Sequence, residues 1–244
     1  MYFYSLNIRY DGNNFYGSAK QKDVRTVEGE LNKALQKILQ VNLDLIFAGR
    51  TDKKVHAINQ TISFSINNKI KYQKKHFLFI LNKILPSDIE VFDFKRHQEF
   101  FNARFDCNKR VYEYLIELTP HNLFKRNYVS QYDHEINLNK LKNASKLFLG
   151  THNFLSYSTS EKTDTIRTIY QFSIKKITNN IIKITVSANG FLRSQIRMMV
   201  ASLLKYNENK LTLNDLNNYL LNPKKGASNT KAAAQGLYFK KAIY

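Results

Sequence analysis

One acidic side chain, Asp52, stands in a short segment whose other charged residues are basic. Cations around a carboxylate favour its ionised form, and an ionised carboxylate can act as a nucleophile. The alternative is structural, because a lone aspartate often caps a turn or pairs with a neighbouring arginine. The basic neighbours of Asp52 within the segment Ala48–Ala57 are Arg50, Lys53, Lys54 and His56.

Predicted strands on both sides would hold this segment in place. The apolar run Leu45–Phe47 precedes it and the alternating run Ile62–Ile66 follows it, and both patterns are typical of β-strands. We therefore predict that residues 48–57 form a loop leaving the edge of a sheet. Such loops often carry functional side chains, because the sheet fixes where they begin and end.

The composition predicts a globular protein with a polyanionic partner. The chain has 244 residues, of which 43% are hydrophobic, and its 38 Lys and Arg against 19 Asp and Glu give a net charge of +19. Solubility alone requires much less charge than this. The imbalance favours nucleic acid, ahead of an anionic membrane surface.

Several classes of site are not expected. Cys107 is the single cysteine, which excludes an internal disulfide and a cysteine metal cluster. The six histidines show no metal-binding spacing, and the eight glycines form no phosphate-binding loop. No apolar run approaches the ~18–20 residues that span a bilayer, and no secretory signal is evident. We therefore expect a cytoplasmic protein that works without metal or cofactor.

Alternating and helical patterns predict an α+β protein with two halves. In the first half, a strand is expected at Tyr2–Tyr10, a helix after the N-cap Thr26, a second helix around Phe77–Ile84 and a strand at Ile89–Phe94. With the strands beside the Asp52 loop, this order is typical of a ferredoxin-like unit with an antiparallel sheet. We assign residues 1–105 to the first half and 106–244 to the second.

The second half is expected to begin with a strand at Lys109–Ile116, on which Tyr112, Tyr114 and Ile116 share one face. A core-facing helix is expected around Ile196–Leu203. Arg193 and Arg197 are four residues apart, so we predict that they share one face of that helix. Further strands and a helix are expected at Arg167–Tyr170, Ile182–Val186, Leu213–Leu221 and Ala233–Phe239.

Six motifs along the chain resemble, in the same order, those of the tRNA pseudouridine synthase A family. They are Tyr10-Asp11-Gly12 with Phe15-Tyr16-Gly17, Gly49-Arg50-Thr51-Asp52 with Val55-His56-Ala57, Leu81–Ile89, Phe101–Phe105, Asn189–Val200 and Ala233–Phe239. The chain departs from the family pattern at Ser194, Gln195 and Met198 and at two further places. Lys53-Lys54 stand where the family has Ala-Gly, and Ser18-Ala19 stand where it has Trp-Gln.

The resemblance implies a fold of two ferredoxin-like halves flanking a basic cleft. It also implies a homodimeric isomerase that converts uridine to pseudouridine in the anticodon arm of tRNA, at positions 38 to 40, without a cofactor. Asp52 would be the nucleophile, and Arg50 or Arg197 would keep it ionised and orient it. Asp52 would act at C1′ of the ribose, by direct attack or by removing a proton from C2′.

Other residues are implied to bind the substrate. Tyr112 matches the tyrosine that packs against the extruded base, which needs a stacking surface, and Leu237 would line the same pocket. Arg193 or Arg197 would reach a phosphate. Lys53 and Lys54 would contact phosphates beside the uridine.

Two other functions remain compatible with the sequence. The substitutions near Asp52 and at Ser18-Ala19 are compatible with a non-catalytic RNA-binding protein or RNA chaperone derived from the same family. A ribosome-associated basic protein would explain the charge but not the six motifs. Assay of pseudouridine formation in unmodified tRNA, with no cofactor added, discriminates the enzyme from both alternatives.

Overall fold

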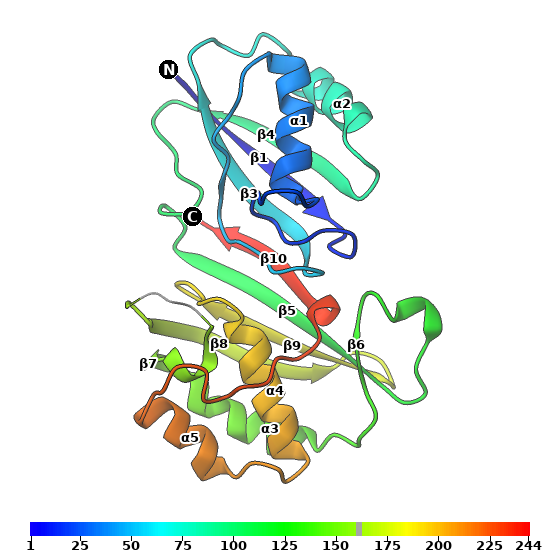
Figure 1. The fold of residues 1–244 in the computed structure, drawn as a ribbon, viewed down its shortest axis with the longest axis vertical. Coiled ribbons are helices and arrows are strands. Elements are labelled where there is room, and N and C mark those ends of the chain that lie inside the picture. Colours follow the sequence, from blue (N-terminus) through cyan, green and yellow to red (C-terminus); the bar gives the residue numbers. More distant parts are fainter. Residues whose placement is uncertain (160–162) are drawn as a thin grey trace. The chain divides into compact units, whose positions relative to one another are not determined.

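The computed structural model describes residues 1–159 and 163–244, and these divide into two compact units. The first unit contains Met1–Arg110 and Tyr238–Tyr244, and the second contains Val111–Leu237. Both combine helices with a sheet whose described strand pairs are mostly antiparallel (Figure 1). The predicted α+β class is confirmed. Within the described residues, no helix combines the length and apolar character needed to cross a bilayer.

The first unit is a small sheet with two helices beside it (Figure 1). Its strands run in the order β4-β1-β3-β10, with β2 also paired to β3. β1 is antiparallel to β3 and β4, whereas β10 is parallel to β3. The elements are β1 (Tyr2–Tyr10), α1 (Val27–Leu39), β2 (Ile46–Phe47), β3 (His56–Ile66), α2 (Lys74–Ile84), β4 (Ile89–His97) and β10 (Leu237–Ile243).

Alternation along β1 builds the core of this unit. Tyr4, Leu6 and Ile8 alternate along the strand, so they share one face of it, and they are at most 2% exposed. α1 begins as predicted at Thr26, whose side chain accepts a hydrogen bond from the amide of Gly29. Both helices bury an apolar stripe, as predicted, and α2 ends before Pro86 because proline cannot continue a helix.

β3 is longer than predicted and begins at His56, so the loop that carries Asp52 ends at Val55. The first half of this strand contains the polar residues His56, Asn59 and Gln60, so it lacks the apolar alternation that predicts a strand. Its polar residues His56, Gln60 and Thr61 are nevertheless buried, and Gln60 donates from Nε2 to the carbonyl of Gly49 at 2.6 Å. The bond gives the buried Nε2 atom of Gln60 a partner, as buried polar groups require.

The second unit has strands in the order β5-β9-β8-β7, with β6 parallel to β5. α3 packs against α4 and β8. Short turns of 3-10 helix occur at 123–125, 146–148, 155–157 and 234–236. The elements are β5 (Lys109–Leu118), β6 (Ser130–Tyr132), α3 (Leu138–Ser145), β7 (Gly150–Asn153), β8 (Ile166–Lys176), β9 (Ile181–Ala188), α4 (Gln195–Asn207) and α5 (Leu213–Leu221).

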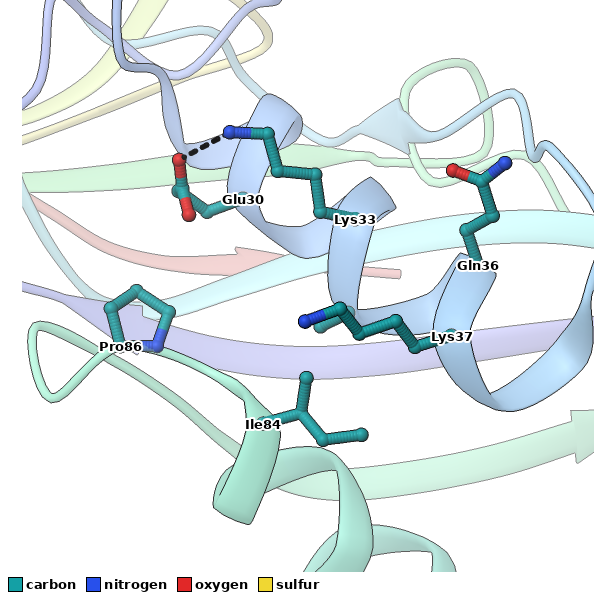
Figure 2. A pocket seen from close by; sticks show the side chains of 7 residues that line it. Glu30, Lys33, Gln36, Lys37, Ile84 and Pro86 are labelled. Atoms are coloured by element: carbon teal, nitrogen blue, oxygen red, sulfur yellow. Dashed lines mark hydrogen bonds and ion pairs between the residues drawn. The ribbon is translucent and has the colours of Figure 1, made fainter.

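A shallow hollow of about 400 Å³ lies in the first unit between α1 and the end of α2 (Figure 2). Glu30 and Lys33 form an ion pair of 3.1 Å on its α1 side, with Lys37 one turn further along. Ile84 and Pro86 form the opposite side. None of the residues of the Asp52 loop lines this hollow.

Candidate active site

Hydrogen bonds from the backbone of Ala48 and Thr51 hold the first half of the Asp52 loop, residues 48–55. The amide of Ala48 donates to the carbonyl of Thr61 at 2.9 Å. Thr51 makes two bonds with Ser18: its amide donates to Ser18 Oγ at 2.8 Å, and its carbonyl accepts from the Ser18 amide at 3.1 Å. Ser18 is 0% exposed. The residue before Asp52 is therefore held from both sides of its peptide unit.

Tyr10 holds the Thr51 side chain. The two hydroxyl oxygens lie 2.8 Å apart, and both residues are buried. Burial raises the pKa of Tyr10 to about 12, because the phenolate form loses its hydration. The phenol is thus neutral at physiological pH and able to share a hydrogen bond with Thr51.

Asp52 itself is half-buried and begins a tight turn. Its carbonyl accepts from the amide of Val55 at 3.2 Å, and Lys54 within the turn has φ +65°, in the left-handed region. The Lys54 amide donates to the carbonyl of Phe15 at 3.3 Å. The left-handed backbone explains why glycine suits position 54. Lysine adopts the same conformation here, and the turn at Asp52 is retained.

The segment 11–18 packs closely against the loop at two glycines. A Cβ on Gly12 would lie 2.1 Å from the carbonyl oxygen of Val55. Gly17 has φ +112°, and a Cβ there would lie 2.9 Å from the carbonyl oxygen of Thr51. Both contacts are with backbone atoms, so no side chain can move aside. The loop and the segment 11–18 form one rigid backbone unit.

The basic side chains of the loop face solvent. Arg50, Lys53 and Lys54 are all exposed. Lys53 is held over the ring of Tyr16, with Nζ 3.7 Å from the ring centroid. This contact fixes an ammonium group one residue away from Asp52.

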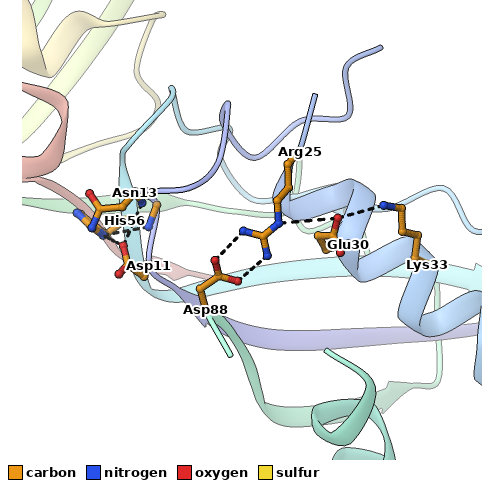
Figure 3. A network of polar contacts seen from close by, with 8 residues as sticks. Asp11, Asn13, Arg25, Glu30, Lys33, His56 and Asp88 are labelled. Atoms are coloured by element: carbon orange, nitrogen blue, oxygen red, sulfur yellow. Dashed lines mark hydrogen bonds and ion pairs between the residues drawn. The ribbon is translucent and has the colours of Figure 1, made fainter. Parts of the chain in front are cut away.

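His56 was not singled out by the sequence prediction, although it lies in the same motif as Asp52. It is 2% exposed, and its ring stacks on Tyr238 with centroids 4.7 Å apart. Nδ1 lies 3.0 Å from the Gly12 amide and 3.2 Å from Oδ1 of Asp11 (Figure 3). Both contacts use the same nitrogen, so Nδ1 accepts from Gly12 when it carries no proton and donates to Asp11 when it carries one.

A second polar group anchors the segment 11–18 from outside (Figure 3). Arg25 donates two hydrogen bonds to the carboxylate of Asp88, at 2.7 and 2.8 Å, and its guanidinium lies 4.2 Å from the centroid of Phe15. The bonds from Arg25 lower the pKa of Asp88. The amide of Asp11 donates to the carbonyl of Asp88 at 3.0 Å. The ion pair thus supports the strand end that contacts His56.

Arg110 is another residue that the sequence prediction missed. It lies at the start of β5 but within the first unit, and its Nε donates to the carbonyl of Ala48 at 2.7 Å. The same guanidinium contacts the carbonyls of Cys107 and Arg104. The sequence around Arg110 gave no indication of this role, because the carbonyl of Ala48 lies 62 positions away.

The predicted substrate-binding residues Tyr112 and Leu237 belong to the second unit. Tyr112 is 7% exposed, and its ring meets Phe191 edge to face with centroids 5.2 Å apart. It shares a buried face of β5 with Tyr114 and Ile116, as predicted. Leu237, at the start of β10, is also 7% exposed.

The prediction that Arg193 and Arg197 share one helical face is wrong. α4 begins at Gln195, and Ser194 has φ +63°, so Arg193 precedes the helix. Gln195 secures this start by accepting the amide of Leu192 at Oε1, 2.8 Å away. Arg193 is exposed, whereas Arg197 is half-buried and donates from Nε to the carbonyl of Ala232 at 2.8 Å. Helical spacing applies only where the backbone is helical.

The described residues contain no group of three or more His, Cys, Asp or Glu side chains arranged to hold a metal ion. The Asp52 loop offers a carboxylate on a fixed backbone, with exposed cations around it. Such a site can attack an electrophilic carbon or remove a proton, provided that the substrate is brought to it.

Comparisons with known proteins agree with this description. Residues 7–106 and 144–244 match the family described as tRNA pseudouridine synthase. A tRNA pseudouridine synthase A from Ureaplasma parvum is 40% identical over 99% of this chain and 99% of its own length. One from Mycoplasma genitalium is 40% identical over 97% of this chain and 96% of its own, and one from a Thermotoga species is 36% identical over 97% of each.

Among solved structures, the archaeal box H/ACA sRNP Nop10-Cbf5 complex matches with a TM-score of 0.38 and 14% identity, over 87% of this chain and 53% of that chain. A score of this size carries no argument beyond the match itself. The family match and the full-length relatives decide the assignment. The chain belongs to the tRNA pseudouridine synthase family, whose members are isomerases.

Proposed function

We propose that this chain isomerises uridine to pseudouridine in tRNA, at positions 38 to 40 of the anticodon arm, with Asp52 as the nucleophile. The observation that carries the proposal is the placement of Asp52: it follows a residue held by Ser18 and Tyr10 and begins a turn closed by Val55. A carboxylate that must meet one carbon atom benefits from such a fixed backbone. The net charge of +19 supports an RNA substrate.

The reaction rearranges bonds without net redox change. The N1–C1′ bond of uridine breaks, the base turns, and a C5–C1′ bond forms. C5 loses its proton and N1 gains one, so the product is an isomer and no co-reactant is consumed. Asp52 acts at C1′ as a nucleophile or removes a proton from C2′. Both routes require the ionised carboxylate.

We extend the proposal to the remaining residues predicted from the sequence. Arg50 or Arg197 orients Asp52 for the reaction. Tyr112 holds the extruded base by stacking, with Leu237 lining its pocket. The remaining basic residues, Arg193, Lys53 and Lys54, bind phosphates. The proposal includes a cytoplasmic homodimer and the anticodon stem-loop as the bound part of tRNA.

The test compares Asp52→Asn with Asp44→Asn, which changes an exposed aspartate of the same unit outside the loop. The substrate is unmodified tRNA carrying tritium at C5 of uridine, because the reaction releases that hydrogen. We expect Asp52→Asn to release none, while its Kd for tRNA stays within about threefold of wild type because phosphate contacts dominate affinity. Asp44→Asn should match wild type in both measurements.

Two results would contradict this role for Asp52. Tritium release by Asp52→Asn at the wild-type rate would exclude the nucleophile. A folded wild type whose Asp52→Asn variant no longer melts cooperatively would instead make Asp52 a structural turn residue. Wild-type protein that binds tRNA tightly but releases no tritium would favour the non-catalytic RNA-binding alternative.

A further inference from the structure

The connection between β5 and β6, residues 119–129, is an exposed projection of the second unit. The two strands lie side by side and parallel, with Ile116 opposite Ser130 and Leu118 opposite Tyr132. A chain that returns to run parallel to its own preceding strand needs a crossover of about a dozen residues. Here the crossover is the loop beside β6, with one short helical turn (Figure 1).

Hydrogen bonds hold this connection in a defined conformation. The amide of Asn122 donates to Oε2 of Glu117 at 3.0 Å, and Glu117 is 0% exposed. The Asn122 side chain then accepts from the amide of Phe124 at 2.9 Å. Two more bonds close the turn, from the amides of Lys125 to Asn122 at 3.0 Å and of Val129 to Lys125 at 3.1 Å. A buried carboxylate therefore anchors the base of the projection.

The tip presents apolar side chains to water. Phe124 is 89% exposed, Leu123 is 63% exposed and Tyr128 is 43% exposed. Exposure of so large an aromatic surface costs free energy in the isolated protein, and adjacent exposed apolar residues commonly mark a binding surface. The hydrogen-bonded backbone holds Phe124 in solvent. We interpret this exposed ring as a contact made in a complex.

The charge around Phe124 defines the partner. Lys125 and Arg126 follow it directly, both are exposed, and residues 119–129 contain no Asp or Glu. A second copy of the chain would bring the same excess of positive charge, a net +19, to these cations. RNA offers the complementary set: phosphates for the cations and the face of a base for the ring.

We propose that the 119–129 connection binds the tRNA substrate, with Phe124 stacked on an accessible base and Lys125 and Arg126 paired with neighbouring phosphates. The inference rests on the proposed function, because it takes tRNA as the substrate. It adds a contact surface apart from the residues that carry out the chemistry. Its contribution is to affinity, so turnover on saturating tRNA is unaffected.

The two kinds of contact have different salt signatures. Stacking is insensitive to salt, whereas each phosphate contact adds about 0.9 to the slope of log K against log salt. Phe124→Ser should raise Kd about 5- to 100-fold with an unchanged slope. Lys125→Ala/Arg126→Ala should lower the slope by about two.

The experiment measures Kd of unmodified tRNA for the full-length protein at four salt concentrations, with tritium release on saturating tRNA in parallel. Phe79→Ser removes another exposed phenylalanine, and Lys175→Ala/Lys176→Ala removes two exposed lysines of the second unit. Phe79→Ser should bind tRNA as wild type does. Comparing Lys125→Ala/Arg126→Ala with Lys175→Ala/Lys176→Ala should show how much of the change in salt slope depends on where the cations lie. Sedimentation of every variant reports the oligomeric state.

The outcomes separate this inference from the proposed function. A Kd of Phe124→Ser equal to that of Phe79→Ser overturns the inference, even if the wild type forms pseudouridine. A change in sedimenting mass confined to Phe124→Ser assigns the surface to a second copy of the chain and also overturns it. Weaker tRNA binding by Phe124→Ser with full turnover on saturating tRNA supports the inference. If the wild type proves catalytically inert, weaker binding by Phe124→Ser than by wild type still supports it. Wild-type protein that does not bind tRNA overturns both.

Discussion

The Asp52 loop and the 119–129 connection both project between paired strands, but they are held in different ways. The loop is held by residues far away in sequence: Ser18 lies 33 positions from Thr51, and Tyr10 lies 41 positions from it. The connection is held by near neighbours, since Asn122 bonds to Glu117 five positions away. The Asp52 loop is therefore held by contacts that form only when the whole unit folds. The 119–129 connection is held by contacts between residues close to one another in sequence.

This difference corresponds to different tasks. Long-range anchors fix one atom relative to a rigid frame, which the proposed chemistry at C1′ would require. Local anchors fix the shape of a surface, which is sufficient for binding through several weak contacts. We therefore expect changes to the anchors of the Asp52 loop to alter kcat, and changes to the anchor of the connection to alter Kd.

The largest effect is expected from Gly12→Ala, because its Cβ would lie 2.1 Å from a backbone oxygen of Val55. The loop must shift, so we expect a loss of roughly 1–3 kcal/mol in unfolding free energy and about a hundredfold in kcat. Urea unfolding and tritium release measure the two. Gly226→Ala is the control: with φ +66° and nothing within 4 Å, it should cost roughly 1–2 kcal/mol from backbone strain alone and leave kcat unchanged. Wild-type turnover in Gly12→Ala would show that the loop is not held this way.

Ser18→Ala removes a long-range side-chain bond, and Asn122→Ala removes a local one while keeping the bond from its own amide to Glu117. Ser18→Ala leaves the buried amide of Thr51 without its acceptor, which costs about 1–3 kcal/mol of stability. We expect kcat to fall while Kd for tRNA is retained. Asn122→Ala frees the amide of Phe124 at an exposed site, where water replaces the lost acceptor. We expect Kd to rise with kcat on saturating tRNA retained. Equal effects of both variants on kcat and Kd would remove the distinction between the two segments.

Tyr10 makes the anchoring of the Asp52 loop dependent on pH. Its folded pKa is raised to about 12 by burial, above the value near 10 of an unfolded chain. The folded state therefore binds the phenolic proton more tightly, and this stabilisation is full below about pH 10 and is lost as pH rises towards 12. Between these values, the unfolding free energy of wild type should fall more steeply than that of Tyr10→Phe, by up to about 1.4 kcal/mol per pH unit. Parallel curves would show that Tyr10 titrates like an exposed phenol.

Regular elements were the part of the fold that local sequence could predict. The N-cap at Thr26 and the end of α2 before Pro86 depend on interactions within a few residues, and both were predicted correctly. The polar start of β3 was not predicted, because burial of Gln60 depends on the carbonyl of Gly49 across the loop. Arg193 was misplaced because the left-handed Ser194 breaks the helical spacing.

The candidate site divides in the same way. The motif located Asp52 and its basic neighbours, which lie on one short segment. It did not reveal the role of Ser18 or Arg110, whose partners are backbone atoms brought together only by the folded unit. Ser18 stands where the family has tryptophan, and the structure gives it a specific task in holding Thr51. A departure from a motif can therefore carry part of the function in this chain.

The smallest expected effect separates two uses of an exposed ring. In our proposal Phe124 presents its ring to a base, whereas Tyr16 uses its ring to hold the ammonium of Lys53 at 3.7 Å. Tyr16→Leu should remove a cation–π contact of about 0.5–1 kcal/mol and raise Kd for tRNA about two- to fivefold. Because Lys53 keeps its charge and its exposure, the salt slope should stay the same. Tyr16→Phe keeps the ring, so it should bind as wild type does.

The control for this prediction is Lys53→Ala, which removes the charge itself. It should lower the salt slope by about one, and Tyr16→Leu should have no further effect in that background, since the ring then has no cation to hold. An equal loss in Tyr16→Phe and Tyr16→Leu would assign the effect to the phenolic hydroxyl. Additive losses in Lys53→Ala/Tyr16→Leu would mean that Tyr16 contacts the RNA directly, and the two exposed rings would then act in the same way.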